Sequence, residues 1–232
     1  MVNGRWHALG SWLWPGTCVL CRAAIGTNNN FCIGCRADLP WITTACPSCA
    51  TPSASSKNAC GACQRKPPIV DSAFAALRYA APVDRLIAGL KYHRRLDLAH
   101  ALGELLSTRL KEHITEQPDL IIPVPLHASR LCQRGYNQAL EIARIVAERL
   151  RIPLYADVVR RVRATATQTA LPLTQRARNV RNAFGVCTGE VSGKHVALVD
   201  DVMTSGHTVN ALAKVLRRAG ASEISVWVVT RA

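Results

Sequence analysis

The sequence predicts an α/β protein with an open, mostly parallel sheet, preceded by a small cysteine-rich module. Cysteine pairs crowd the first part of the chain, and from residue 71 onward apolar strand-like runs alternate with helical periodicity. Such alternation favours parallel strand pairing through crossover helices. The composition changes near Lys66-Pro67-Pro68, so we expect a cysteine-rich domain over 1–66 and an α/β domain over 67–232.

Apolar spacing predicts the elements of the second domain in order. Strands are expected at 72–79, 119–125, 154–159, 195–199 and 224–229, and helices at 82–95, 98–114, 137–150 and 208–219. The segment 160–182 has little periodicity, and it contains six arginines and no acid. A second basic cluster, 91–95, ends a helix, where it either reaches a phosphate or complements the helix dipole.

The overall composition is typical of a globular protein with anionic ligands. Of the 232 residues, 49% are hydrophobic and 19% charged, which excludes a chain that is disordered throughout. No apolar run reaches the ~18 residues of a membrane span, and the interrupted apolar start is a poor signal peptide, so we expect a cytoplasmic protein. The net charge of +14 favours phosphorylated metabolites or nucleic acid as ligands, the alternative being a basic surface that only aids solubility.

Eight of the ten cysteines form four Cys-x-x-Cys pairs that repeat every fourteen residues. They are Cys18 and Cys21, Cys32 and Cys35, Cys46 and Cys49, and Cys60 and Cys63. Two such pairs complete a tetrahedral site of four sulfurs, so the set fits two structural zinc ions, with an iron–sulfur cluster as the alternative. Sequential pairing, the first four and then the last four, closes shorter loops than interleaved pairing. The other two cysteines, Cys132 and Cys187, are expected to be buried thiols.

The segment 195–208 predicts a phosphate site. An apolar strand runs into Asp200 and Asp201, and a hydroxyl-rich loop then precedes a helix. Ligands of open α/β sheets bind at the carboxyl ends of strands, and backbone N–H groups from Thr204 to Thr208 can converge on a phosphate at the helix N-terminus. The acids suit sugar hydroxyls or a Mg²⁺-linked diol, so the segment fits a ribose 5-phosphate. The alternative is that the acids merely cap the helix.

Residues 199–208 resemble the phosphoribosyl-pyrophosphate signature of type I phosphoribosyltransferases. Further resemblance lies in 122–127 with Arg130, in 133–138 and in 168–184. Together with the cysteine pairs in front, the chain resembles the ComF family, competence-associated proteins in which a double zinc ribbon precedes a type I phosphoribosyltransferase-like domain.

The resemblance implies roles for individual residues. Asp200 and Asp201 would be the catalytic pair that holds the ribose hydroxyls. The implied ligand-binding set is Asp200, Asp201, Val202, Met203, Thr204, Ser205, Gly206, His207 and Thr208. The implied pyrophosphate loop is Pro125, Leu126 and His127 with Arg130, and the implied flexible catalytic loop includes Arg176 and Arg178.

The function implied is that of a phosphoribosyltransferase, in the glycosyltransferase class, linked to DNA uptake. It would bind phosphoribosyl pyrophosphate with Mg²⁺ and pass the phosphoribosyl group to an acceptor that no motif identifies. Two alternatives remain. One is a non-catalytic competence factor that binds single-stranded DNA and competence proteins, and the other is a phosphoribosyl-pyrophosphate sensor on the same fold.

Overall fold

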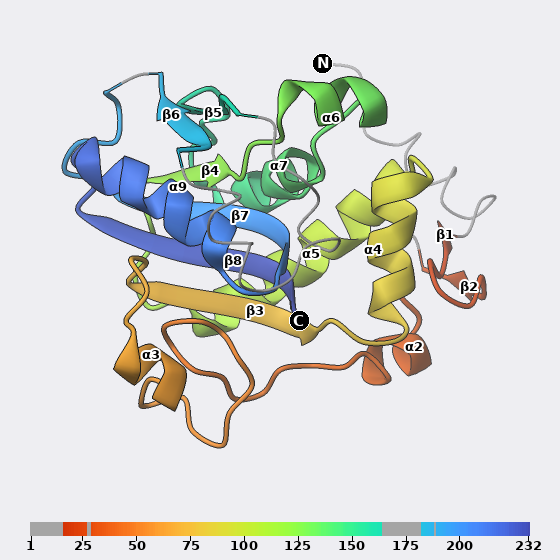
Figure 1. Ribbon diagram of the computed structural model, residues 1–232. Coiled ribbons are helices and arrows are strands. Elements are labelled where there is room, and N and C mark those ends of the chain that lie inside the picture. Colours follow the sequence, from red (N-terminus) through yellow and green to blue (C-terminus); the bar gives the residue numbers. More distant parts are fainter. Residues whose placement is uncertain (1–15, 27–28, 164–181, 188) are drawn as a thin grey trace, which may run out of the picture. The chain divides into compact units, whose positions relative to one another are not determined.

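A four-stranded parallel sheet forms the centre of residues 41–232. Its strands lie in the order β3 (Ser72–Arg78), β8 (Glu223–Arg231), β7 (His195–Met203) and β4 (Leu120–Pro123), as Figure 1 shows. The computed structural model describes residues 16–26, 29–163, 182–187 and 189–232. The chain divides into two compact units, 1–40 and 41–232.

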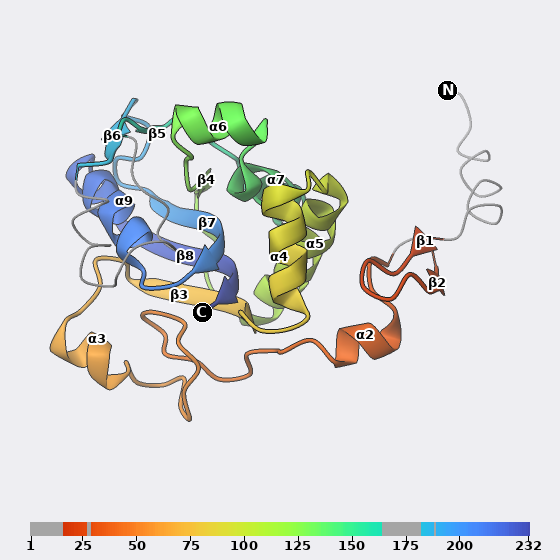
Figure 2. The ribbon, with the colours of Figure 1, turned by 45° about the vertical axis from the view of Figure 1, so that its right-hand side comes forward.

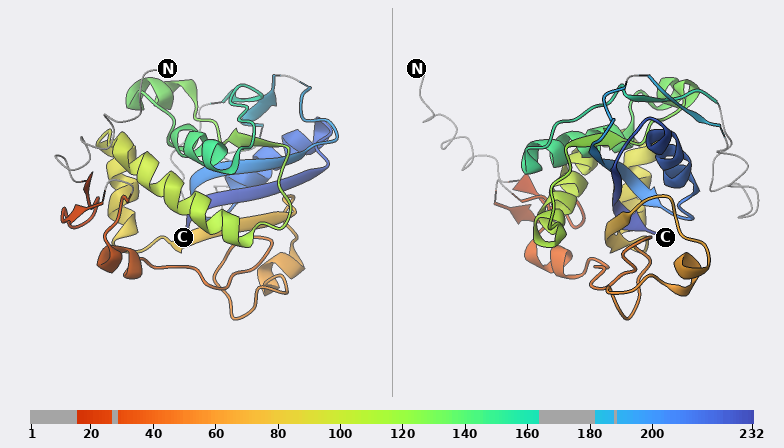
Figure 3. Two further views of the ribbon diagram at one scale, coloured as in Figure 1. Left: turned by 180° about the vertical axis from the view of Figure 1, so that it is seen from behind. Right: turned by 90° about the vertical axis from the view of Figure 1, so that its left-hand side faces the viewer.

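Helices cover both faces of the sheet. α9 (His207–Arg218) lies on one face, and α5 (Leu96–His113) and α7 (Gln138–Leu150) lie on the other, as the opposite views in Figures 1 and 3 show. α4 (Val83–Tyr92) packs beside α5 (Figure 2), and α6 (Ala128–Arg134) precedes α7. Because α7 and α9 lie on opposite faces, the carboxyl end of β7 is a switch point, where open sheets bind ligands.

Burial on both faces explains the composition of the central strands. Every residue from Ile224 to Thr230 is buried, and so is the run from Val196 to Val199. Strands of a parallel sheet with helices on both faces read as continuous apolar runs. The predicted α/β class with a mostly parallel sheet is therefore confirmed.

Most of the predicted elements are present, with ends shifted by a few residues. The expected strand over 195–199 continues to Met203, so that Asp200 and Asp201 belong to β7 itself. Asn137 caps α7 by accepting a hydrogen bond from the Ala139 N–H at 3.1 Å, which starts the helix at Gln138, one residue later than expected.

The strand expected over 154–159 is wrong. Leu154 makes only one isolated bridge to Ile121 at the edge of the sheet. The chain then leaves the sheet, and Val159–Arg161 forms β5, which pairs antiparallel with β6 (Phe184–Val186) in a separate two-stranded sheet. The short helix α6 has no counterpart among the predicted elements.

The cysteine pairs are divided between the two compact units. Residues 1–40 contain β1 (Gly16–Thr17), β2 (Ala24–Ile25) and α2 (Ile33–Ala37), and α3 (Gly61–Arg65) belongs to the second unit. Residues 41–66 join the sheet because the N–H of Ile42 donates to Ala76 O at 3.0 Å and that of Ala73 to Pro47 O at 2.7 Å. The two compact units thus divide between residues 40 and 41. The boundary at 66/67 concerns the end of the cysteine-rich segment in the sequence, and it stays a prediction.

Within the described residues, no helix combines the length and apolar character needed to cross a bilayer.

Candidate functional site

The first four cysteines gather into one group. The sulfur atoms of Cys18, Cys21, Cys32 and Cys35 all lie within 4.8 Å of one another, and the Cys35 N–H donates to Cys32 Sγ at 3.4 Å. Burial opposes ionisation of Cys18, but hydrogen bonds from the Cys21 and Cys32 backbones lower its pKa to about 6. Hydrogen bonds with the Cys32 and Cys21 side chains raise the pKa of Cys35 to about 12. A metal ion that binds these four sulfurs would release the protons that they share.

The last four cysteines of the module form an equivalent group in the second unit. The sulfur atoms of Cys46, Cys49, Cys60 and Cys63 also lie within 4.8 Å of one another. The Cys60 N–H donates to Cys46 Sγ at 3.2 Å, and backbone hydrogen bonds outweigh burial to lower the pKa of Cys46 to about 7. Burial and the Cys49 side chain raise the pKa of Cys63. Both groups offer four sulfurs to one ion, which fits structural zinc.

These groups confirm sequential pairing of the cysteines. The expectation for the remaining two is wrong, because Cys132 and Cys187 are both exposed. Cys132 lies on α6, which has no buried residue, and Cys187 follows the short strand β6. Neither belongs to a cysteine group in the described part of the chain.

The predicted phosphate and pyrophosphate loops come together at the carboxyl edge of the sheet. A pocket of about 190 Å³ opens there between the ends of β4 and β7. The predicted residues that line it are Pro125, Leu126, Arg130, Asp200, Asp201, Val202, Thr204 and Thr208. Met203 does not line it with its side chain, which is 4% exposed and packs into the core. Arg176 and Arg178 lie outside the described residues.

The loop between β7 and α9 presents unpaired backbone donors. The N–H groups of Thr204, Ser205 and Gly206 donate to no other described residue. Gly206 has φ 71° and caps α9, a left-handed conformation that favours glycine. Ser205 Oγ lies 2.9 Å from His207 Nδ1, so His207 joins the loop through its side chain. Unpaired amides at the start of a twelve-residue helix suit an anion.

The two aspartates at the end of β7 have different surroundings. Asp201 is 6% exposed, and its Oδ2 lies 2.8 Å from Lys91 Nζ. Burial would lower the pKa of Lys91, but the Asp201 charge raises it, so the ammonium form is favoured. Asp200 is half-buried and accepts the Asp201 N–H at 2.9 Å. Its burial and the Asp201 charge raise the pKa of Asp200 well above its usual range.

Basic side chains line the same pocket as the acids. Burial and the charge of Arg134 lower the pKa of Arg130, and burial and the charge of Arg130 lower that of Arg161. Guanidinium groups that repel one another across a pocket are stabilised by an anion between them. His127 lies at the entrance to α6, where it accepts the Ser129 N–H at 3.2 Å, and its backbone bridges to Arg161.

Several lining residues were not predicted to bind ligand. Gln138 is 3% exposed, its Oε1 accepts Arg134 Nη1 at 2.9 Å, and its Nε2 has no partner among the described residues. Gln138 lines the pocket, and because Arg134 fixes its amide orientation, this nitrogen is a buried donor. Gln138 belongs to the motif 133–138, and Lys91 to the basic cluster 91–95, so the sequence marked both segments without assigning these contacts.

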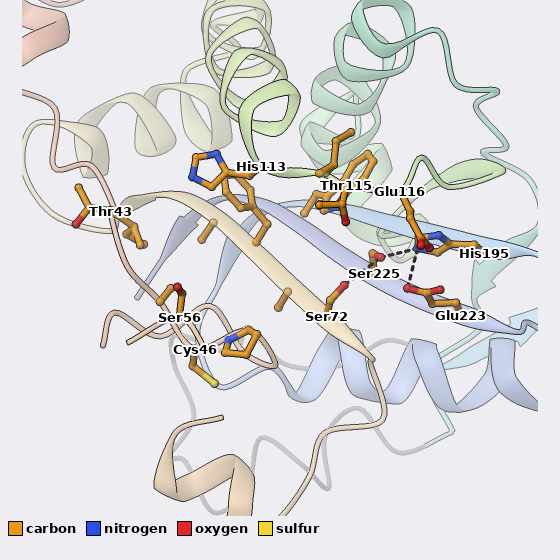
Figure 4. A pocket seen from close by; sticks show the side chains of 18 residues that line it. Thr43, Cys46, Ser56, Ser72, His113, Thr115, Glu116, His195, Glu223 and Ser225 are labelled. Carbon is orange, nitrogen blue, oxygen red and sulfur yellow. Dashed lines mark hydrogen bonds and ion pairs between the residues drawn. The ribbon is translucent and has the colours of Figure 1, made fainter. Parts of the chain in front are cut away.

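A larger cavity of about 510 Å³ opens at the amino ends of β3, β7 and β8 (Figure 4). Ser72 Oγ donates to Ser225 Oγ at 3.1 Å, and Ser225 Oγ lies 2.6 Å from His195 Nε2. The same nitrogen faces Glu223 Oε1 at 3.6 Å. A hydrolytic triad needs the serine and the acid on different nitrogens, so this set lacks that geometry.

Comparison with known proteins agrees with this arrangement. Residues 91–232 match the phosphoribosyl transferase domain family, and residues 9–64 match the double zinc ribbon domain family. The DNA utilization protein YhgH of Shigella flexneri is 36% identical over 222 residues, which cover 94% of this chain and 97% of that protein. Competence protein F of Haemophilus influenzae is 34% identical over 222 residues, or 93% and 96% of the two chains.

The chain belongs to the ComF family. Its two four-cysteine groups are therefore zinc ribbon sites, and its sheet is that of a phosphoribosyltransferase domain. The amidophosphoribosyltransferase of Saccharomyces cerevisiae is 28% identical over 147 residues, which cover 63% of this ComF-family chain and 26% of the yeast protein.

Each zinc site should lose its ion independently. Cys18→Ser or Cys46→Ser is expected to lower the zinc content from about two ions per chain to about one, because each removes one of four ligands from one site. Mass spectrometry of the metal checks this, with the exposed thiol variant Cys132→Ser as a control that keeps both ions. A single substitution that removes both ions would contradict the independence of the two sites.

The ion pair between Lys91 and Asp201 should contribute strongly to the free energy of unfolding. Lys91→Met leaves the Asp201 carboxylate buried without its cation, and we expect the free energy of unfolding to fall by about 2–3 kcal/mol at neutral pH. Adding Asp201→Asn should restore part of the loss. Urea denaturation measures both, with Lys111→Met on the exposed side of α5 as the control. A Lys91→Met protein as stable as the parent would refute the pairing.

Proposed function

We propose that this protein binds phosphoribosyl pyrophosphate with Mg²⁺ at the carboxyl edge of the sheet and transfers the phosphoribosyl group. The observation that carries the proposal is the set of unpaired amides of Thr204, Ser205 and Gly206 in the loop that follows Asp200 and Asp201, with Thr204 and Asp200 lining one pocket. A phosphate monoester accepts from such amides, and a carboxylate accepts from ribose hydroxyls. The names of the relatives support a role in competence or DNA utilization. Competence proteins as partners and a place in the cytoplasm are part of the proposal.

The two acids would divide the work. Asp201 forms an ion pair with Lys91 and would position the end of β7. Asp200 is half-buried, lines the same pocket and would contact the ligand. Its raised pKa means that ligand binding competes with a proton on Asp200. Mg²⁺ takes few carboxylates together with phosphate oxygens, so one free carboxyl suffices to hold it, and bound there it would neutralise charge on the leaving pyrophosphate.

The basic side chains of the pocket would receive the leaving group. As the bond from C1 to the pyrophosphate oxygen breaks, both electrons leave with the oxygen, and a bound acceptor forms the new bond to C1. Arg130 and Arg161 line the same pocket as the acids, where their fixed positive charge would stabilise a developing anion. Gln138 Nε2 would donate one further hydrogen bond to an oxygen in the same space.

Removal of both acids tests the proposal. Asp200→Asn with Asp201→Asn is expected to weaken phosphoribosyl-pyrophosphate binding about a hundredfold in the presence of Mg²⁺, since charge-assisted hydrogen bonds of ~1.5–3 kcal/mol each are lost. Titration calorimetry measures the affinity, and the zinc content should stay unchanged. The exposed acid variant Asp157→Asn is the control. Undiminished affinity in the double variant would show that phosphoribosyl pyrophosphate does not bind at Asp200 and Asp201.

A second candidate function is binding of single-stranded DNA. Beside the first pocket, a hollow of about 310 Å³ is lined by Lys91, Tyr92, Arg94, Arg130, Gln133 and Arg134. Tyr92 is 64% exposed, and the Arg134 guanidinium lies 5.5 Å from the centre of its ring. An exposed ring among cations, with no acid in the lining, suits stacked bases and phosphates.

Salt dependence and stacking separate the two contributions to such binding. Tyr92→Ala should weaken binding of a fluorescent oligonucleotide about tenfold with no change in salt slope, because a stacked base contributes ~1–3 kcal/mol. Arg94→Gln should lower the slope of log affinity against log salt by about one, because one phosphate contact is lost. Leu96→Ala, which removes an exposed apolar chain without a ring, is the control. Binding insensitive to both substitutions would exclude this surface.

A further inference from the structure

Arg231, the last residue of β8, contacts both the second zinc site and the phosphate loop, which is the segment from Thr204 to Thr208 after β7. Its Nε donates to Cys49 O at 3.0 Å, and its Nη2 donates to Thr51 Oγ1 at 3.0 Å. Its Nη1 donates to Met203 O at 3.1 Å and also to Thr204 O. The planar guanidinium, with donors in fixed directions, therefore ties together two segments that lie far apart in the sequence.

The carbonyl contacts orient the amides of the phosphate loop. A trans peptide is planar, and its C=O and N–H point in opposite directions. Met203 O shares a peptide with the Thr204 N–H, and Thr204 O shares one with the Ser205 N–H. When Arg231 holds both oxygens on one side of the loop, both N–H groups must face away from it. These are two of the three amides that donate to no other described residue.

The other end of the contact reaches a zinc ligand. Cys49 Sγ and Thr51 Oγ1 are hydrogen bonded at 3.2 Å. Because Thr51 Oγ1 accepts from Arg231, its own proton is available to donate to the sulfur when Cys49 is a thiolate. The knuckle around Cys49 is closed by the Ala50 N–H to Cys46 O at 2.8 Å and the Cys46 N–H to Thr51 O at 2.9 Å. A metal that holds this knuckle therefore also holds the acceptors of Arg231.

We propose that Arg231 is a positioning residue that sets the phosphate-loop amides by anchoring them to the second zinc ribbon site. Zinc at Cys46, Cys49, Cys60 and Cys63 then determines the order of the loop, and zinc at the first site does not. The part of this proposal that concerns ligand affinity rests on the proposed phosphoribosyl-pyrophosphate site. By linkage, a ligand on the loop strengthens zinc binding at the second site by the factor that zinc contributes to ligand affinity.

Arg231→Lys tests the positioning role with the charge kept. A lysine cannot reach these acceptors in one plane, so we expect the NMR order parameters of the Thr204 and Ser205 amides in the ligand-free protein to fall from about 0.85 to below about 0.6, with both zinc ions retained. Phosphoribosyl-pyrophosphate affinity should fall about tenfold. The control is Arg78→Lys, because Arg78 is the exposed ladder partner of Arg231 on β3. Unchanged order parameters of the loop amides in Arg231→Lys would overturn the proposal.

Substitutions on the metal side test the link itself. Thr51→Val keeps all four sulfurs but removes the bridging hydroxyl. It should quicken zinc release to a chelator and lower the NMR order parameters of the loop amides, whereas Thr51→Ser should restore both. Cys49→Ser should loosen the loop amides, and Cys21→Ser, the equivalent change in the first site, should not.

The measurements on ligand-free protein separate this proposal from the proposed function. Should the chain bind no phosphoribosyl pyrophosphate, the order parameters and the zinc-release rates would still decide whether Arg231 couples the two segments. Equal order parameters of the loop amides in Cys49→Ser and Cys21→Ser, or no effect of Thr51→Val on either readout, would refute the coupling.

Discussion

Two carboxylates at adjacent positions at the end of a buried strand are the constraint on which the site depends. β7 lies between β4 and β8 with helices on both faces, so neither charge is fully hydrated. Lys91, supplied by α4, compensates Asp201, and this contact links α4 to the end of β7. Burial and the Asp201 charge raise the pKa of Asp200, and the Lys91 charge offsets this rise only in part. The packing of α4, the ionisation of the two acids and the shape of the pocket therefore depend on one another through the Lys91–Asp201 ion pair.

The second zinc ribbon site also has a structural task at the sheet edge. β3 is an outer strand, and exposed edges invite pairing with other chains. Trp41 bridges to Leu77, and the Ile42 N–H donates to Ala76 O, so the segment before the cysteines occupies part of this edge. A cysteine-rich segment with few apolar side chains gains its order from metal, and here that order is used to cover the sheet.

The sequence predicted the elements whose burial pattern is simple and missed those that depend on distant partners. β8 and β7 are continuous apolar runs, and α7 has clear helical spacing, so their positions are confirmed. Tyr155 and its neighbours are apolar enough for a strand, but they meet the sheet at one bridge only, which no local pattern reveals.

The sequence also identified the segments of the candidate site but not the contacts between their side chains. The segments around Asp200 and Pro125 were identified, and the structure brings both to one pocket. The partner of Asp201 could not be deduced, because Lys91 lies in a basic cluster whose members look alike in sequence, and only the fold shows which of them reaches that acid. The contacts of Arg231 likewise join residues whose proximity arises from the fold alone.

The unpaired amide nitrogen of Gln138 has a consequence for selectivity. Arg134 holds its oxygen, so the side chain cannot rotate to offer a lone pair without losing that bond. In the proposed site, a ligand oxygen that reaches this nitrogen would complete its hydrogen bonding, whereas a methyl group or another N–H there would leave a buried donor unmet, at a cost of about 1–3 kcal/mol. Gln138 would thereby favour ligands that present a lone pair at this position.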